Sequence, residues 1–181
     1  MNSATKNLEN DHVHILRLID VMERATNAET PDVDHLEVMV DLIKTFADGF
    51  HHAKEETLLF PLLVEKGFSI DQGPVGVMLK EHVQGRNYVK GMADNINLYK
   101  TGDKKALPLI YQNMNGYIEL LRNHINKENN ILFKMADRVL TENDHQTLLQ
   151  QYGEIDIHNI CGGDLTKCLS KIETLAKAYD I

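Results

Sequence analysis

Apolar residues recur every three to four positions along nearly the whole chain, whereas no stretch alternates apolar and polar residues as a half-buried strand would. This periodicity predicts an all-α fold. Gly73-Pro74 is typical of a break followed by a first-turn proline, Thr141 starts a sequence resembling a capping box, and Pro61 predicts a kink or an end in the second helix. We expect helices at residues 5–27, 34–66, 73–100 and 104–140, and a last helical segment from residue 141 that Gly162-Gly163 divides in two.

Four long helices with short connections are typical of an antiparallel four-helix bundle of up-down-up-down topology, which we place at residues 5–140. Residues 141–181 then form a C-terminal helical extension, whose apolar stripes predict packing onto the bundle or, as the alternative, a contact between the two copies of a homodimer. The 181 residues, 43% hydrophobic and 25% charged, match one ordinary globular domain. We therefore expect a single domain over residues 1–181.

The charge balance and the apolar runs exclude several classes of partner. The formal net charge is -8, and no cluster of Lys and Arg is present that could neutralise phosphates, so we expect no nucleic-acid binding. The longest uninterrupted apolar run, Leu58 to Val64, is far shorter than the roughly 20 residues of a membrane span. The first residues show no apolar region typical of a secretory signal. These features predict a cytoplasmic protein without membrane contact.

One motif occurs twice. The sequences His51–Phe60 and His124–Phe133 both follow the pattern HxxKExxxLF, the first in the second predicted helix and the second in the fourth. A weaker echo links the first and third helices, where Asp11-His12 and Glu81-His82 each place an acid before a histidine. The repeat predicts two similar helical hairpins that face each other across a pseudo-twofold axis.

Helical spacing predicts which members of the repeat point inward. His51 and Glu55 lie one turn apart and share a stripe of apolar neighbours, whereas His52 and Glu56 share a face with polar residues and are predicted to point outward. The same reasoning places His124 and Glu128 on a core stripe, His82 on another, and His12 rather than His14 inside the first helix.

Four histidines and two glutamates converging in one core predict a metal site. Two ionised carboxylates buried without partners would cost many kcal/mol, against a total stability of about 5 to 15 kcal/mol for an average domain. A pair of metal ions bridged by the glutamates and completed by the imidazoles supplies the missing positive charge. Mixed imidazole and carboxylate ligation favours iron, then manganese, over a structural zinc site, and Cys161 and Cys168 do not form a zinc knuckle.

The strings HHAKEETLLFP, GPVGVMLKEH and NHINKENNILF resemble the hemerythrin-like (HHE cation-binding) family over roughly residues 5 to 140. The resemblance implies a non-haem di-iron centre, Fe-O-Fe or Fe-OH-Fe, that carries O2 or reacts with peroxide or NO, with manganese or zinc as substitute metals. The ligand positions that it implies are His12, His51, Glu55, His82, His124 and Glu128.

The chain departs from the oxygen-carrying hemerythrins at Arg86, where those proteins carry a further histidine one turn after the ligand of the third helix. This change opens a coordination position or invites a replacement ligand. The remaining set of four histidines and two glutamates is closer to the di-iron domain of proteins that repair iron-sulfur clusters.

Four residues near the predicted ligands have more than one possible role. Tyr117, two turns before His124, either donates a hydrogen bond to a bound oxygen species or is a core tyrosine. Arg86 pairs with a surface acid or with Glu81, or lies beside the open iron position. Asp11 and Glu81 cannot share a face with the histidines that follow them, so we expect both to be solvated rather than hydrogen-bonded to the metal ligands.

Three functions remain open from the sequence. The protein is a binding or sensing module for a small diatomic ligand, a di-iron enzyme that reduces peroxide or NO, or an iron donor for cluster repair. No flavin, haem or rubredoxin-like module is recognisable that would supply electrons, so the enzymatic alternative requires a separate electron-donor protein. This favours binding and sensing, or slow chemistry supplied with electrons by a separate reductase.

Overall fold

The computed structural model describes residues 3–155 and 164–181, and these residues form helices and connecting segments without a strand. The all-α prediction is therefore confirmed. The first long helix is α1 (Ala4–Ala25) and the third is α4 (Gly73–Lys100). The second consists of α2 (Val33–Leu42), the π-helical segments η1 (Ile43–His52) and η2 (Glu55–Leu59), and α3 (Phe60–Glu65). The fourth consists of α5 (Ala106–Lys127), the π-helical η3 (Glu128–Leu132) and α6 (Phe133–Val139).

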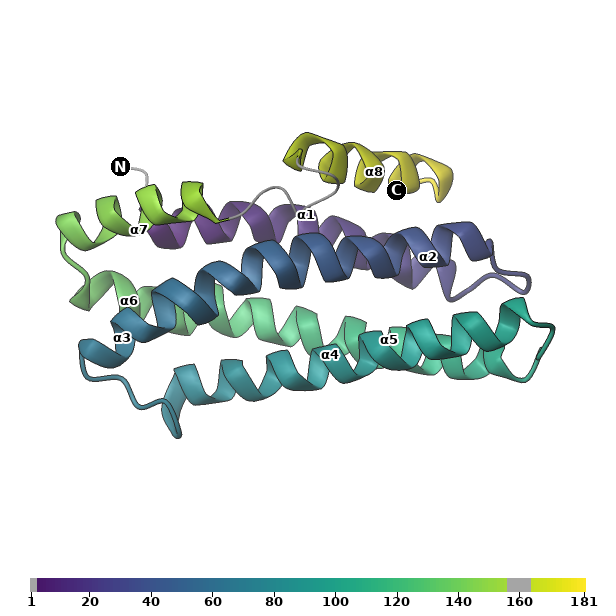
Figure 1. Ribbon diagram of the computed structural model, residues 1–181, viewed down its shortest axis with the longest axis horizontal. Coiled ribbons are helices and arrows are strands. Elements are labelled where there is room, and N and C mark those ends of the chain that lie inside the picture. Colours follow the sequence, from purple (N-terminus) through teal and green to yellow (C-terminus); the bar gives the residue numbers. More distant parts are fainter. Residues whose placement is uncertain (1–2, 156–163) are drawn as a thin grey trace.

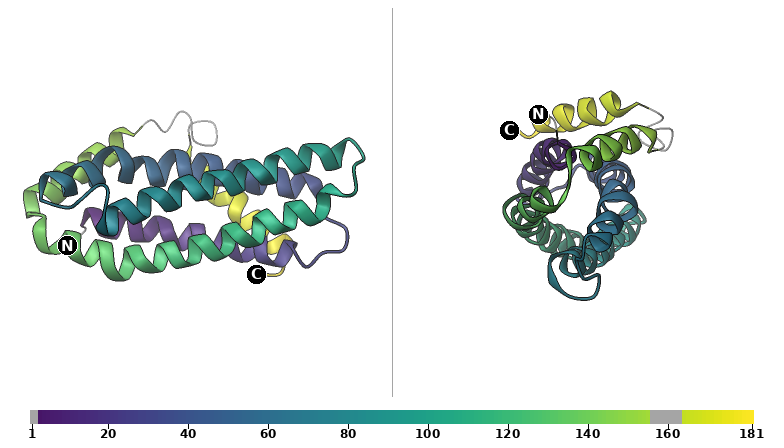
Figure 2. Two further views of the ribbon diagram at one scale, coloured as in Figure 1. Left: turned by 90° about the horizontal axis from the view of Figure 1, so that it is seen from below. Right: turned by 90° about the vertical axis from the view of Figure 1, so that its left-hand side faces the viewer.

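The four long helices run up and down alternately, and seen end-on they surround one central axis (Figures 1 and 2). The predicted ends lie within a few residues of the observed ones because local caps fix them. The Ser3 side chain accepts from the backbone N–H of Lys6 at the start of α1, Asp32 caps α2, and Pro74 lies in the first turn of α4.

The helix that contains Pro61 does not end there, contrary to one of the two outcomes expected from the sequence. A proline ring clashes with the carbonyl four residues earlier in a regular α-helix. Here the preceding turn is widened, and the N–H of Phe60 bonds the carbonyl of Glu55, five residues back. The matching N–H of Phe133 bonds the carbonyl of Glu128 in η3, so both copies of the repeat carry a π segment that begins at the glutamate.

Two apolar clusters fill the bundle and leave a polar layer between them. One contains Ile15, Phe46 and Leu121, and the other contains Leu8, Leu59 and Leu132. The histidines and glutamates of the repeat lie between these positions on all four helices. The polar layer is thus closed off from solvent at both ends by packed side chains.

The C-terminal helices α7 (Glu142–Glu154) and α8 (Leu165–Ala178) pack onto the bundle. Leu148 and Tyr152 of α7 join one apolar cluster, while Ile172 and Leu175 of α8 join the other. Figure 1 shows α8 beside α1 and α2. Gly162-Gly163, the predicted division, lie outside the described residues. Across residues 3–155 and 164–181, none of the helices combines the length and apolar character that a bilayer span requires.

Candidate metal centre

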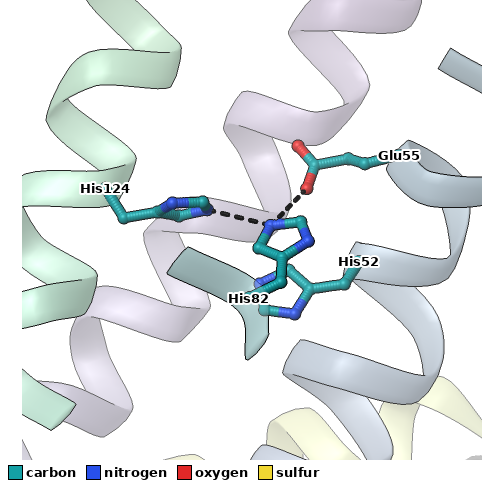
Figure 3. A group of neighbouring side chains, drawn as sticks. All are labelled: His52, Glu55, His82 and His124. Atoms are coloured by element: carbon teal, nitrogen blue, oxygen red, sulfur yellow. Dashed lines mark hydrogen bonds and ion pairs between the residues drawn. The ribbon is translucent and has the colours of Figure 1, made fainter. Parts of the chain in front are cut away.

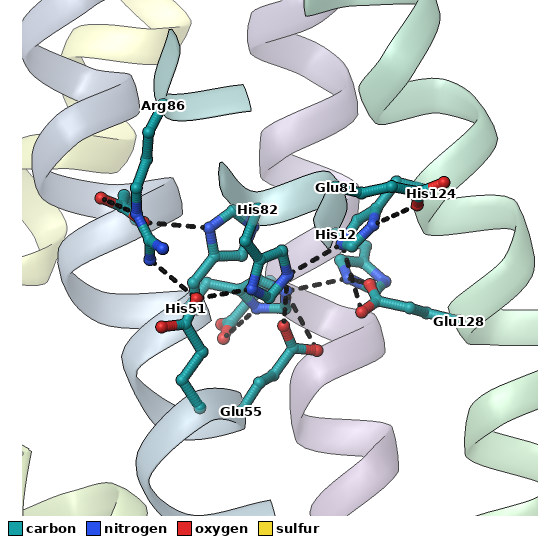
Figure 4. Close-up of polar contacts among 12 residues, drawn as sticks. His12, His51, Glu55, Glu81, His82, Arg86, His124 and Glu128 are labelled. Atoms are coloured by element: carbon teal, nitrogen blue, oxygen red, sulfur yellow. Dashed lines mark hydrogen bonds and ion pairs between the residues drawn. The ribbon is translucent and has the colours of Figure 1, made fainter. Parts of the chain in front are cut away.

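The six residues predicted as metal ligands come together in the polar layer at mid-bundle (Figure 4). Each of the four long helices contributes, and every one of these side chains is at most 2% exposed. The contributions are His12 from α1, His51 and Glu55 from the second helix, His82 from α4, and His124 and Glu128 from the fourth helix.

The histidines form two pairs. Nε2 of His12 lies 2.9 Å from Nε2 of His51, and Nε2 of His82 lies 3.1 Å from Nε2 of His124. Each pair joins a histidine that follows an acid, His12 or His82, to the first histidine of an HxxKExxxLF motif, His51 or His124. This arrangement is the pseudo-twofold symmetry that the sequence predicts.

Each glutamate lies between the two histidine pairs and presents one oxygen to each. Glu128 Oε2 is 3.2 Å from Nε2 of His12, and its Oε1 is 3.2 Å from Nε2 of His124. Glu55 Oε1 is 3.7 Å from Nε2 of His51, and its Oε2 is 3.5 Å from Nε2 of His82. Both carboxylates therefore have the placement of bridging groups between two positions.

The far nitrogen of each imidazole donates outward to an oxygen. These contacts run from Nδ1 of His12 to Asn129 (2.7 Å), of His51 to Asp11 (3.3 Å), of His82 to Glu56 (2.6 Å) and of His124 to Glu81 (2.9 Å). Carboxylate and amide oxygens only accept, so the Nδ1 atoms carry the protons. In the neutral rings, the bare Nε2 lone pairs then point inward at one another.

The inward-facing carboxylate oxygens and imidazole nitrogens lack positively charged partners for their lone pairs, and metal ions would supply such partners. Both oxygens of Glu55 and both of Glu128 are buried and accept no hydrogen bond from the described residues. Unpaired lone pairs of two imidazoles at 2.9 Å repel as well. Two groups of four ligand atoms, one around His12 and His51 and one around His82 and His124, are compact enough to hold a metal ion. The residues present therefore fit a metal centre.

The pKa values reflect this burial. Desolvation and the nearby His12 lower the pKa of His51 to about 4, so its ring is neutral and able to bind a metal near pH 7. Burial, together with the charge of Glu128, raises the pKa of Glu55 well above its usual range. Burial opposes protonation of His124 too, but the carboxylates of Glu128 and Glu81 raise its pKa to about 9.

His52 points into the centre, which corrects the prediction that it faces outward. It is 6% exposed, and its ring stacks on that of His82 with centroids 3.8 Å apart. A regular α-helical period predicts the outward face, but His51 and His52 both end the π-helical segment η1, whose wider turns do not follow that period. Both His51 and His52 are buried, and each belongs to one of the two groups of possible metal ligands.

Asp11 and Glu81 are not the solvated acids that the sequence suggested. Each faces away from the histidine that follows it and accepts instead from a histidine of the neighbouring helix, Asp11 from His51 and Glu81 from His124. Each also binds the lysine of one HxxKE motif, Lys54 or Lys127.

Two further acceptors, Glu56 and Asn129, were missed. Their position in the repeat could have indicated them, because each directly follows the inward glutamate of one repeat copy. Asn129 accepts a hydrogen bond from His12 of the other hairpin, and Glu56 accepts one from His82 of the other hairpin. Such partners orient the ring and increase its basicity toward a metal.

A cavity of about 310 Å³ borders one side of the centre. Its inner wall includes His52, His82 and His124, and Tyr117 and Gly85 also line it. Tyr117 is buried, and burial raises its pKa, so its hydroxyl stays protonated. Tyr117 is thus beside the cavity, as one of its two interpretations requires.

Arg86 does not reach the inward-facing atoms. Its guanidinium binds Asp48 (2.9 Å) and Glu56 (2.7 Å) near the surface, and among the described residues it forms no ion pair with Glu81. The interpretation of Arg86 as a partner of surface acids is therefore supported, with different acids from the one expected.

The chain is similar to one protein-family model and to curated proteins named for iron-sulfur cluster repair. A family model described as the hemerythrin HHE cation binding domain matches residues 3–136. The iron-sulfur cluster repair protein YtfE of Escherichia coli O157:H7 is 28% identical, over 68% of this chain and 59% of its own length. A probable iron-sulfur cluster repair protein of Haemophilus influenzae is 33% identical, over 69% of this chain and 56% of its own. The chain thus spans less than two thirds of these relatives. No solved structure matches it significantly.

Proposed function

This chain belongs to the hemerythrin HHE cation-binding domain family, and from that premise we propose that it holds two iron ions and binds or reacts with O2, peroxide or NO. The observation that carries the proposal is the placement of Glu55 and Glu128, whose four unsatisfied oxygens face both histidine pairs. A bridging carboxylate needs a cation on each side, and two carboxylates between two imidazole pairs define two such positions.

The proposed ligands are His12 and His51 for one ion and His82 and His124 for the other, with Glu55 and Glu128 shared. A ferrous pair supplies electrons and coordination positions for a small oxidant or a diatomic ligand. The chain orients the imidazoles through their outward hydrogen bonds, and the two apolar clusters keep bulk water away. The cavity beside His82 and His124 has room for a small molecule near the ions.

A second candidate function is iron donation for repair of iron-sulfur clusters. The names of the relatives from Escherichia coli and Haemophilus influenzae favour it. The same ligands would serve it, provided that at least one ion leaves the centre readily. An electron-donor protein is an additional partner that turnover of peroxide or NO would require.

The experiment is metal analysis of the purified protein, followed by anaerobic titration with O2, peroxide and NO while the visible spectrum is recorded. We expect about two irons per chain. A charge-transfer band that appears with O2 and reverses on its removal supports a carrier or sensor, whereas repeated consumption of peroxide or NO supports an enzyme. Ready loss of iron to an apo-acceptor protein supports repair.

Two outcomes would overturn the two-iron proposal. One is a protein that takes up no iron from an anaerobic Fe(II) solution, and the other is a single tightly held zinc per chain. Manganese in both positions would retain the two-metal architecture but refute the choice of iron.

A further inference from the structure

We propose that His52 is a fifth imidazole ligand, bound to the ion held by His82 and His124, so that the two metal positions are unequal. This inference rests on the proposed two-metal function. It concerns a residue outside the six-ligand set and gives the second position three imidazoles, whereas the position at His12 and His51 has two.

The first observation is distance. A ring nitrogen of His52 and the ligand atoms of Glu55, His82 and His124 all lie within 4.8 Å of one another. Figure 3 shows the four side chains converging from the second, third and fourth long helices. The His52 ring is nearly parallel to that of His82, with an interplanar angle of 18°, and it faces His124 edge-on at 5.9 Å. A buried imidazole in this place adds a donor atom to the same group.

The second observation is that His52 has the same hydrogen bonding as the four other inward histidines. Its Nδ1 donates to Asp48 Oδ1 at 3.2 Å, and Asp48 is fixed in turn by the Arg86 guanidinium. The proton is therefore on the outer nitrogen, and Nε2 is left with a free lone pair. Histidines that bind metals typically show this pairing, in which the other ring nitrogen donates to a carboxylate.

The third observation is asymmetry. The pseudo-twofold repeat places Ile125 where the other copy has His52, and Ile125 is buried in an apolar cluster. The ion at His12 and His51 therefore gains no equivalent ligand from the fourth helix. Only one of the two positions can be completed in this way.

The test counts ligating imidazoles directly. Unpaired electrons of Fe(II) shift the proton on a ligating imidazole far outside the ordinary range, and hydrogen bonds to buried acceptors slow its exchange with water. The full chain is loaded anaerobically with Fe(II), and its exchangeable shifted signals are compared with those of His52→Phe. Phenylalanine keeps a ring that stacks on His82 but cannot bind iron. The control is His35→Gln, because His35 lies beside Tyr179, outside the centre.

We expect five exchangeable shifted signals in the parent protein and in His35→Gln, and four in His52→Phe. We also expect His52→Phe to hold one of its two irons at least about tenfold more weakly against a competing chelator. Circular dichroism establishes that the variant is folded, and His52→Gln repeats the test if it is not.

Four signals in both the parent and His52→Phe, with two irons bound to each, would refute a ligand role for His52 and leave the proposed function intact. Failure of the parent itself to bind two irons would instead refute the proposed function.

Discussion

At the scale of single residues, the two bridging positions make a sharp prediction for Glu55→Gln. An amide costs less to bury than a carboxylate but cannot bridge two cations by charge. We expect the metal-free variant to be at least as stable as the metal-free parent. We also expect it to lose most of the gain in melting temperature that Fe(II) gives the parent. Metal analysis and thermal melts with and without Fe(II) measure both effects, with Glu119→Gln, an exposed site, as the control. Full iron content in Glu55→Gln would contradict the bridging role.

Glu81→Gln tests the outward hydrogen bonds. Gln can still accept from His124 Nδ1, but it lacks the charge that increases the basicity of the ring and that also binds Lys127. Mutation of such a partner typically lowers metal affinity by about 10- to 100-fold, and we expect a loss in this range for Glu81→Gln. Competition with a chelator of known affinity measures the loss, and Glu142→Gln provides the control. An unchanged affinity for iron would mean that the charge of Glu81 contributes only to its ion pair with Lys127.

The sequence could predict four of the proposed ligands because a spacing of four residues keeps His51 with Glu55, and His124 with Glu128, on one helix face. The other two, His12 and His82, were predicted from the apolar neighbours that share their faces. It could not predict that Asp11 and Glu81 would reach across to a neighbouring helix. Spacing along one helix says nothing about contacts between helices, which depend on how closely the hairpins pack. The sequence shows the acids Asp11 and Glu81, but it does not show that their hydrogen-bond partners are His51 and His124.

At the scale of elements, the π-helical segments explain the one wrong face. The periodicity of residues 34–66 predicts a regular helix up to the kink or end expected at Pro61, and the apolar stripe supports that view. A widened turn leaves almost no trace in the hydrophobic pattern, because the core residues on either side stay buried. His52 was therefore placed on the polar face of Asp48, which turns out to be its hydrogen-bond acceptor.

Gly76 of α4 is predicted to tolerate no side chain. A Cβ there would lie 2.7 Å from the carbonyl oxygen of Ile70 and 2.9 Å from the carbonyl carbon of Asp71, which are backbone atoms with little freedom to move. We expect Gly76→Ala to lower the free energy of unfolding by about 1–3 kcal/mol. Gly153→Ala is the matched control, because a Cβ there meets nothing within 4 Å, and we expect it to be neutral or stabilising by up to about 1 kcal/mol. Urea unfolding of both variants measures the difference, and equal effects would contradict the prediction.

The carboxylate of Asp144 stabilises the N-terminus of α7 to an extent that depends on pH. It forms a reciprocal capping box with Thr141 and binds Lys66, and these contacts lower its pKa to about 2. Because the folded pKa lies below the unfolded value of 3.8, the stabilisation is present above about pH 4 and is lost as the pH falls toward 2. We expect Asp144→Asn to lower the melting temperature at pH 7, with a difference from the parent that shrinks between pH 4 and 2. A difference independent of pH would show that the charge does not contribute.

At the scale of the whole molecule, the fold supports the site by enclosing a polar layer between two apolar ones. Helix propensity and periodicity were sufficient to predict the bundle, since each long helix carries an apolar stripe on both sides of the polar layer. They were not sufficient to choose the role of residues 141–181, because an amphipathic helix packs equally well on its own chain or on a second copy. The choice depends on which surface α1 and α2 leave uncovered.

Ile172 tests whether the extension and the bundle unfold together. Its side chain is fully buried in the apolar cluster that includes Ile15 and Phe46, and Arg17 of α1 also binds the backbone oxygen of Ile181. We expect Ile172→Ala to cost about 2–5 kcal/mol and to lower the single melting transition of the whole chain. Iron content below that transition should not change, because Ile172 lies in an apolar cluster and not in the polar layer that holds the proposed ligands. Two separate transitions in the variant, one near the parent's melting temperature, would mean that α8 unfolds independently and that the bundle is stable without it.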